Sequence, residues 1–144
     1  MNFNKDELTI KNDFVFGSVM SSKKICLDLI RLILPEMKIK SIKFPERQKT
    51  VEDKFHSHGV RFDVYTKDDQ GDAYEIEMQV KNTNDLLQRA RYYRGRIDSD
   101  NLARGDKYAL LKKTFVIFIC DFDLFGLGLH KYEFQNILIS DSHL

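Results

Sequence analysis

The sequence lacks the features that would place it in a membrane or a secretory pathway. Its 144 residues contain no Trp, two Cys and two Pro. No apolar run reaches the roughly 18 residues that a membrane-spanning helix needs. The first residues, M-N-F-N-K-D-E, are polar and acidic and are not typical of a signal peptide. We therefore expect a cytoplasmic protein without a membrane partner.

Scarce cysteine and balanced charge exclude further classes. Cys26 and Cys120 stand alone without a C-x-x-C partner, so we predict reduced core thiols rather than a disulfide framework. Charged residues make up 31% of the chain but the net charge is only +1, so any surface for nucleic acid must be local. The 42% of hydrophobic residues predict a single domain with a real core over residues 1–144. We expect no organic cofactor.

The most informative stretch present is a predicted hairpin at residues 59–81. Its arms read G-V-R-F-D-V-Y and A-Y-E-I-E-M-Q-V-K, and both alternate with period two, which is typical of β-strands. Gly71 lies in the polar turn between them and suits a short loop with one residue at positive φ. If the turn centres on Gln70, residues whose numbers sum to 140 face each other.

This register predicts one apolar face and one acidic face. The apolar face, which must be buried, consists of Val60, Phe62, Val64, Ile76, Met78 and Val80. On the other face Asp63 lies opposite Glu77, with Glu75 and Gln79 beside them. Two carboxylates directly across from each other repel. We therefore predict that the pair holds a cation.

Paired carboxylates suit a hard divalent cation such as Mg²⁺, which keeps several waters and binds substrate phosphate. Such an ion can lower the pKa of water and neutralise charge that grows on phosphorus. Gln79 could orient water or a substrate oxygen, but it carries no positive charge at any pH. The layout suits phosphodiester hydrolysis. The alternative is a solvated face of alternating charge, because short motifs match by chance often.

Three helices are predicted from apolar spacing and capping residues. Residues 8–20 form the first, Ser21 or Ser22 begins the second, and Pro35 ends it. A cap within residues 82–84 begins the third. The candidate N-caps of the first helix are Thr9 and Asn12. The apolar positions of the second are Ile25, Leu29, Leu32 and Ile33, and those of the third are Leu86, Ala90, Tyr93 and Ile97.

Five further segments complete the predicted fold. Residues 37–44 alternate and predict a strand, whereas residues 46–57 predict a loop or extended arm. Residues 108–111 suit one helical turn. Residues 114–120 are apolar on both faces and predict a central strand, and residues 129–134 predict a last one. The order α, α, β, β, β, α, β, β gives an α/β fold with a mixed sheet and helices on its faces.

The helix after the hairpin is rich in arginine. Its basic and aromatic residues are Arg89, Arg91, Tyr92, Arg94 and Arg96. Such arginines can hold DNA phosphates, with binding that weakens as salt rises. They can equally pair with acids, since charge runs are usually solvated faces; the acids are Asp85, Asp98 and Asp100. We expect Arg89 and Arg96 to share a face, and Tyr92 to stack on a base or flank the core.

The ordered set of motifs resembles the PD-(D/E)XK nuclease superfamily, and more closely its recombination-promoting nuclease / putative transposase family. No single motif is specific, and the resemblance covers about residues 8–125. The stretches that carry it are K-N-D-F-V-F near Asp13, R-F-D-V-Y around Asp63, Y-E-I-E-M-Q at residues 74–79, Q-R-A-R-Y-Y at residues 88–93, G-D-K-Y-A-L-L-K-K at residues 105–113 and I-F-I-C-D-F at residues 117–122.

The resemblance implies a restriction-endonuclease-like fold and a Mg²⁺-dependent DNA endonuclease, with Mn²⁺ as a substitute ion, linked to recombination or transposition. It assigns the metal to Asp63, Glu77 and the Met78 carbonyl, and it places Gln79 at the usual lysine position. Glutamine occupies that position across the putative-transposase family, yet it leaves the activation of water without a cationic helper. DNA is the implied partner. A homodimer would suit double-strand cutting, although the sequence has no direct sign of one.

Each secondary candidate for the site also has an ordinary structural explanation. Asp13 could reach the metal, but an acid at a helix N-terminus is also favourable there. Glu75 could be the second ligand, or it could lie near the edge of the site or in solvent. Lys81 could approach the phosphate or be a solvated strand-end lysine. The histidines that could ligate zinc, without a third ligand at suitable spacing, are His56 and His58.

Two other functions compete with the nuclease. The chain could be a DNA-binding or assembly module that has lost catalysis, because fold does not fix function. It could also be a protein–protein component that uses the aromatic tail at residues 122–134 as an interface. Metal titration, DNA nicking and size-exclusion behaviour separate these hypotheses.

Overall fold

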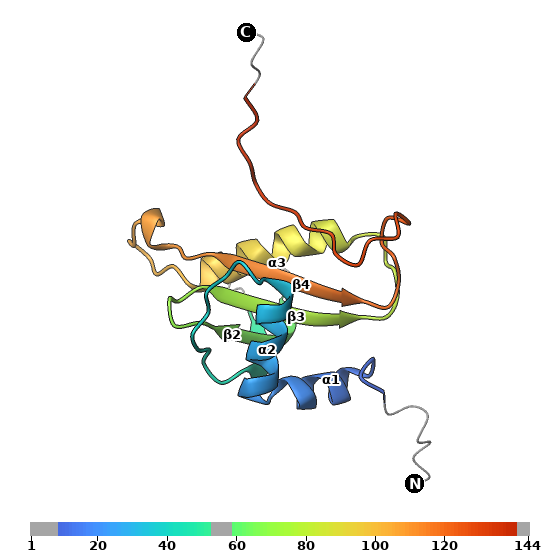
Figure 1. The fold of residues 1–144 in the computed structure, drawn as a ribbon. Helices are drawn as coiled ribbons and strands as arrows, with labels where there is room; N and C mark the ends of the chain where they lie inside the picture. Colours follow the sequence, from blue (N-terminus) through green and yellow to red (C-terminus); the bar gives the residue numbers. More distant parts are fainter. Residues whose placement is uncertain (1–8, 53–58, 141–144) are drawn as a thin grey trace.

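The computed structural model describes residues 9–52 and 59–140. These residues form one sheet with helices on both of its faces (Figure 1). The elements in chain order are α1 (Asp13–Met20), α2 (Lys23–Ile33), β1 (Glu46–Val51), β2 (Val60–Lys67), β3 (Ala73–Gln79), α3 (Leu86–Asp100), the 3₁₀ turn η2 (Tyr108–Leu110) and β4 (Thr114–Cys120). The sheet has four strands in the order β1-β2-β3-β4. The β3–β4 pair is parallel and the other two are antiparallel. The predicted mixed α/β sheet with flanking helices is confirmed.

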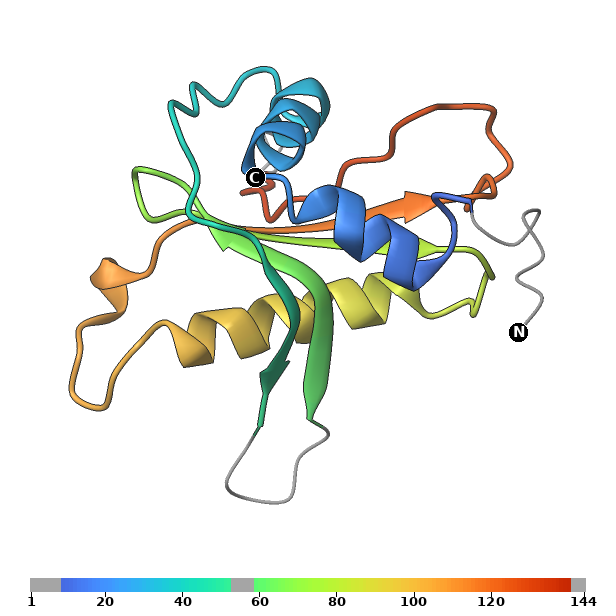
Figure 2. The same ribbon diagram turned by 90° about the horizontal axis from the view of Figure 1, so that it is seen from below.

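Two apolar clusters fill the two sides of the sheet. Figure 2 shows α1 and α2 on one face and α3 on the other. The first cluster lies under α1 and α2 and includes Phe16, Cys26, Ile30, Tyr74 and Ile76. The second lies under α3 and consists of Val51, Val60, Phe62, Tyr65, Ala73 and Ile97. None of the helices in the described residues is long and apolar enough to cross a membrane.

The first two helices begin where side-chain caps satisfy their free N–H groups. The Asn12 carboxamide accepts from the N–H groups of Phe14 and Val15 at 3.0 and 3.3 Å, so α1 begins at Asp13. Ser22 caps α2, as one of the two predicted alternatives. The predicted apolar positions of α2 are partly wrong, because its buried residues are Cys26 and Ile30, one helical turn apart, while Ile25 and Leu32 are exposed.

The strand predicted at residues 37–44 is wrong, apart from one isolated bridge at Ile42. Its backbone groups have other partners. The Arg31 guanidinium donates to the carbonyl of Ile39 at 2.7 Å and to that of Lys40 at 3.2 Å. These carbonyls are therefore bound by a side chain of α2 instead of a neighbouring strand.

The segment predicted as a loop or arm supplies the first strand instead. Residues 46–51 form β1, which pairs with β2 from Glu46↔Tyr65 to Val51↔Val60. This ladder skips Gln48, whose φ of 50° is left-handed. The rest of the predicted arm, residues 53–58, lies outside the described residues and includes His56 and His58.

The predicted hairpin and its register are confirmed over the paired stretch. β2 and β3 pair from Val64↔Ile76 to Lys67↔Ala73, and each pair of numbers sums to 140. Gly71 has the predicted positive φ, at 89°. The acidic face of the hairpin therefore follows the expected alternation on β3.

The predicted single apolar face of the hairpin is wrong. Val64 packs into the first cluster, but Phe62 packs into the second, although residues two apart on a regular strand share a face. The packing side changes between Val64 and Phe62, and Figure 2 shows that β2 is bent along its length. Phe62 then stacks on Tyr65 and meets Tyr93 of α3 edge-on. Val80 at the far end is 44% exposed.

The last part of the chain contains fewer strands than predicted. β4 forms as expected, but it lies at the edge of the described sheet, and of its residues only Ile117 is buried. Residues 129–134 are not a strand. The Asp123 carboxylate turns the chain by accepting from the N–H groups of Gly126 and Gly128 and from the Tyr132 hydroxyl. The chain then leaves the sheet as an extended segment (Figure 1).

Candidate acid site

The polar face of β3 lies against α3. Glu75, Glu77 and Gln79 alternate along the strand, so they share one face. Arg89 of α3 bonds to both Glu77 and Gln79, which identifies that face. Ile76 points the other way into the first cluster. Glu75 is 0% and Glu77 7% exposed, so two carboxyl groups are buried between a strand and a helix.

Asp63 lies beside these acids where β2 leaves β3. The β2–β3 ladder ends at Val64↔Ile76, one step before the predicted Asp63–Glu77 pair. The Asp63 carboxylate accepts a hydrogen bond from the backbone N–H of Met78. Its side chain therefore lies against β3 in the gap that opens between the two strands.

The carboxylates of the site raise one another's pKa values. Burial raises the pKa of Asp63, and the negative charge of Asp13 raises it further. Burial also raises the pKa of Glu77; the Arg89 guanidinium opposes this shift, while the charges of Asp63 and Asp13 add to it. The structure thus brings Asp13, in the first turn of α1, within electrostatic range of both predicted ligands. Converging negative charge is what a divalent cation relieves.

We expected Glu75 to be the second ligand, or to lie near the edge of the site or in solvent. It is fully buried. Burial raises its pKa well above the ordinary glutamate value, and the charges of Glu77 and Asp63 add to this shift. Among the residues that the structure describes, neither of its carboxyl oxygens has a hydrogen-bond partner. Buried polar atoms in folded proteins nearly always have one. Glu75 is therefore a buried carboxyl group without a hydrogen-bond partner beside two other acids, and its cost to the fold requires an explanation.

Arg89 is the basic residue of the site itself. Its Nη2 donates to Glu77 Oε1 and to the Tyr93 hydroxyl, the latter at 3.1 Å. Its Nη1 donates to Gln79 Oε1 at 3.0 Å. The Gln79 amide donates in turn to the Lys81 carbonyl at 2.7 Å, whereas the Lys81 side chain is exposed. Arg89 was predicted to be one of the DNA-binding arginines. Its place in the first turns of the helix that follows the acidic strand could have indicated a position beside the acids.

A groove of about 810 Å³ runs beside the acids, between the start of β2 and α3. Its lining includes Arg61, Arg89, Arg91, Tyr92, Gly95 and Arg96. Arg89 and Arg96 both line this groove, while Arg94 is not part of the lining. Sequence analysis missed Arg61, whose signal was its place two residues before Asp63. Among the predicted acid partners, Asp100 pairs with Lys49 and Asp98 with the Thr114 hydroxyl.

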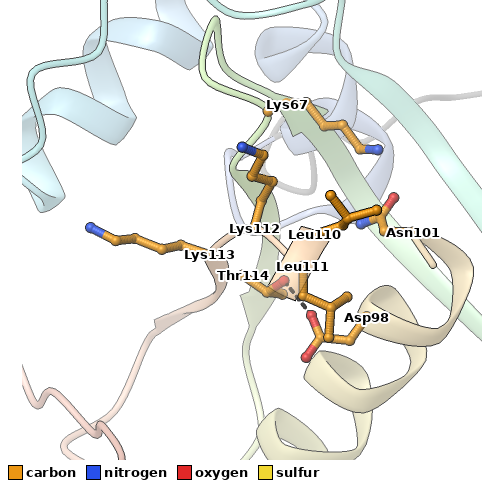
Figure 3. A pocket seen from close by; sticks show the side chains of 9 residues that line it. Lys67, Asp98, Asn101, Leu110, Leu111, Lys112, Lys113 and Thr114 are labelled. Atoms are coloured by element: carbon orange, nitrogen blue, oxygen red, sulfur yellow. Dashed lines mark hydrogen bonds between the residues drawn. The ribbon is translucent and has the colours of Figure 1, made fainter. Parts of the chain in front are cut away.

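A second, smaller pocket of about 70 Å³ lies near the other end of α3 (Figure 3). Asp98 points to Thr114 there, and its Oδ1 accepts a hydrogen bond from the Thr114 hydroxyl at 2.7 Å. Figure 3 shows the ends of Lys112 and Lys113 directed away from this pair. The pocket lining contains no residue of the acid site, whereas the lining of the groove includes Arg89, which bonds to Glu77, so the groove is the better candidate.

The carboxylate oxygens of the acid site are suitable ligands for a hard cation. The side chains alone, however, do not complete the set of ligands that such an ion needs. Across residues 9–52 and 59–140, no three His, Cys, Asp or Glu side chains form a group that could hold a metal ion. Asp63 and Glu77 offer two carboxylates, and the unpartnered oxygens of Glu75 lie nearby. A cation here would need backbone oxygen or water as further ligands.

The sheet and its acid-bearing hairpin define an α/β fold of the restriction-endonuclease type. Residues 10–142 match the family model for the PD-(D/E)XK nuclease family transposases, so the chain belongs to that family. Neither the curated proteins nor the solved structures include a match to it. The family supports a nuclease or transposase type of function.

Proposed function

We propose that this chain is a metal-dependent DNA endonuclease that hydrolyses phosphodiester bonds, linked to recombination or transposition. Family membership supports the reaction class. The observation that carries the proposal is the convergence of Asp63 and Glu77 beside the end of the β2–β3 ladder, where like charge and burial raise both pKa values. Perturbed carboxyl groups beside a groove are typical of functional sites.

Each site residue has a proposed role. Asp63, Glu77 and the Met78 carbonyl hold the cation, which is Mg²⁺ or, as a substitute, Mn²⁺. When bound, this ion supplies positive charge beside the scissile phosphate and lowers the pKa of water. Gln79 orients the attacking water or a phosphate oxygen through its amide. Asp13 adds negative charge that favours cation binding.

The groove beside the acids is the proposed path of the DNA. Arg61, Arg91 and Arg96 line it, and Tyr92 is 41% exposed there, so a base could stack on its ring. Gly95 lies in the lining too, within α3, where glycine costs about 0.5–1 kcal/mol relative to alanine. A Cβ atom added to it would meet nothing within 4 Å, so the described fold does not require glycine there. We infer that the DNA backbone passes close to this turn.

The test is nicking of supercoiled DNA with Mg²⁺ or Mn²⁺. Asp63→Asn and Glu77→Gln should each abolish cleavage, because each removes a charged cation ligand, while circular dichroism shows an intact fold. Asp28→Asn is the matched control, since Asp28 is exposed on the opposite face and pairs only with Lys24 in the described contacts. Cleavage by either site variant at the wild-type rate would refute the assigned roles.

The second candidate is a DNA-binding or assembly module without catalysis. Two observations favour it: the lysine position holds Gln79, and no three-ligand side-chain group occurs in the described residues. DNA binding without nicking at any Mg²⁺ or Mn²⁺ concentration would support this module. The homodimer stays a prediction, which size-exclusion chromatography with light scattering can test.

A further inference from the structure

The acidic face of β3 has no positive charge of its own. Its three residues are Glu75, Glu77 and Gln79, and an amide cannot carry charge. A site that handles a phosphodiester and two carboxylates needs positive charge to offset theirs. The guanidinium of Arg89 enters this face from α3.

The position of the Arg89 guanidinium is fixed from several sides. It bridges Glu77 and Gln79 with separate nitrogens, and it also donates to the Tyr93 hydroxyl. Its central carbon lies 5.5 Å from the centre of the Tyr93 ring and 5.3 Å from that of Phe118, a residue of β4. The planar fork of arginine suits such a bridge through two separate nitrogens, whereas lysine has one nitrogen. Residues from β3, α3 and β4 thus hold the Arg89 guanidinium in place.

This geometry does not suit a phosphate contact. The Arg89 side chain is 25% exposed, and its guanidinium already donates to Glu77, Gln79 and Tyr93. If Arg89 turned toward a phosphate, the buried Glu77 carboxylate would lose its counter-charge. Isolated buried charges are strongly unfavourable, so the guanidinium stays beside Glu77.

We propose that Arg89 is a positioning residue that orients the Glu77 carboxylate and the Gln79 amide and supplies the positive charge that Gln79 lacks. The inference rests on the proposed function and deepens it. Arg89 and a divalent cation bind the same carboxylate, so Arg89 also weakens cation binding to the free protein. Its loss therefore has opposite effects on cation binding and on cleavage.

The experiment compares Arg89→Met and Arg89→Lys with the wild type in three measurements: Mn²⁺ binding without DNA, DNA affinity, and the kinetics of cleavage. Arg89→Met should bind Mn²⁺ about tenfold more tightly, because one nearby positive charge is gone. Its kcat should fall about 10–100-fold, the usual effect of losing a group that orients a ligand, while KM changes less than about twofold. Arg89→Lys keeps the charge without the bridge, so its kcat should be intermediate.

A matched control and the contrary outcomes complete the test. Arg104→Met removes an exposed arginine beyond the other end of α3 and should change none of the three quantities. A folded Arg89→Met variant with wild-type kcat, or with weaker DNA binding and unchanged kcat, would overturn the inference. If Arg89→Met does not fold, full activity of Arg89→Lys overturns it.

The Mn²⁺ measurement separates this inference from the proposed function. If the wild type never cleaves DNA, the proposed function fails, but tighter Mn²⁺ binding by Arg89→Met would still support competition for Glu77. Equal Mn²⁺ binding by the two proteins, or none by either, contradicts the inference whatever the cleavage result.

Discussion

The β2–β3 hairpin buries acids at both of its ends, and at the turn they are well satisfied. Asp68 and Asp72 are 3% and 7% exposed. Asp68 accepts from the N–H groups of Gln70 and Asp72 at 2.9 Å each and from the Tyr74 hydroxyl at 2.8 Å. Asp72 accepts from the N–H of Lys113 at 3.0 Å. These carboxylates close the turn and attach it to the chain that leads into β4.

At the other end of the hairpin the acids are as deeply buried but poorly satisfied. Within the described residues Glu75 has no hydrogen-bond partner, and Glu77 depends on Arg89. Buried carboxylates that close a turn stabilise the fold, whereas buried acids without donors destabilise it and are typical of functional sites. Burial alone therefore does not identify a functional acid on this hairpin. A buried acid without hydrogen-bond donors is the informative case.

The largest expected effect on stability is at the turn. Asp68→Ala should lower the free energy of unfolding by about 3 kcal/mol, because it leaves one buried N–H group, one partly buried N–H group and a buried hydroxyl without their acceptor. Urea unfolding measures this change. Gln70→Ala is the control, since that side chain is exposed and should change stability by less than about 0.5 kcal/mol. Folded Asp68→Ala should still cleave DNA; loss of cleavage without loss of stability would contradict the contrast.

The opposite sign is expected at the acid site. Glu75→Met should raise the free energy of unfolding by about 1–3 kcal/mol near neutral pH, because it removes a buried acid without a partner. Glu36→Met, at an exposed glutamate, is the control and should have almost no effect. A large loss of stability in Glu75→Met would show that Glu75 has a structural partner.

The same residue predicts a pH dependence. The pKa of Glu75 is raised in the folded protein, so the native state keeps a proton that the unfolded chain has lost above the ordinary glutamate pKa of 4.5. Stability therefore falls as pH rises from that value toward the raised pKa. Unfolding between about pH 5 and about pH 8 should show a shallower decline in Glu75→Met than in the wild type. Equal slopes would mean that Glu75 does not hold its proton.

The smallest expected effect is in the groove. Gly95→Ala should raise the free energy of unfolding by about 0.5–1 kcal/mol, because alanine favours the helix and meets no neighbour. It should also weaken DNA binding, since its methyl group occupies the proposed path of the strand. Ser99→Ala on the same helix, outside the groove lining, is the control. Unchanged DNA binding in a stabilised Gly95→Ala protein would exclude close passage of the strand there.

The sequence predicted the hairpin because its alternation is strong and its turn is short. The same pattern could not show that β2 changes its packing side, since that change depends on Phe62 packing against Tyr65 and Tyr93. The strand at residues 37–44 was mispredicted for a similar reason. Its alternation is real, but the Arg31 guanidinium, from the helix that precedes it, binds its carbonyls.

The candidate site was only partly predictable. Asp63, Glu77 and Gln79 follow from period two and a short turn. The burial of Glu75 depends on α3 covering the sheet, which local sequence does not report. The position of Arg89 depends on how far along α3 the acids meet the helix, so its bridge between Glu77 and Gln79 needed the structure.

The central claim is that Asp63 and Glu77 bind one divalent cation, and anomalous diffraction from crystals grown with Mn²⁺ tests it most directly. The account predicts one strong anomalous peak with carboxylate oxygens of both residues as ligands and the Arg89 guanidinium retained beside Glu77. A peak bound by one of the two acids alone, or no peak on this face of β3, would contradict it.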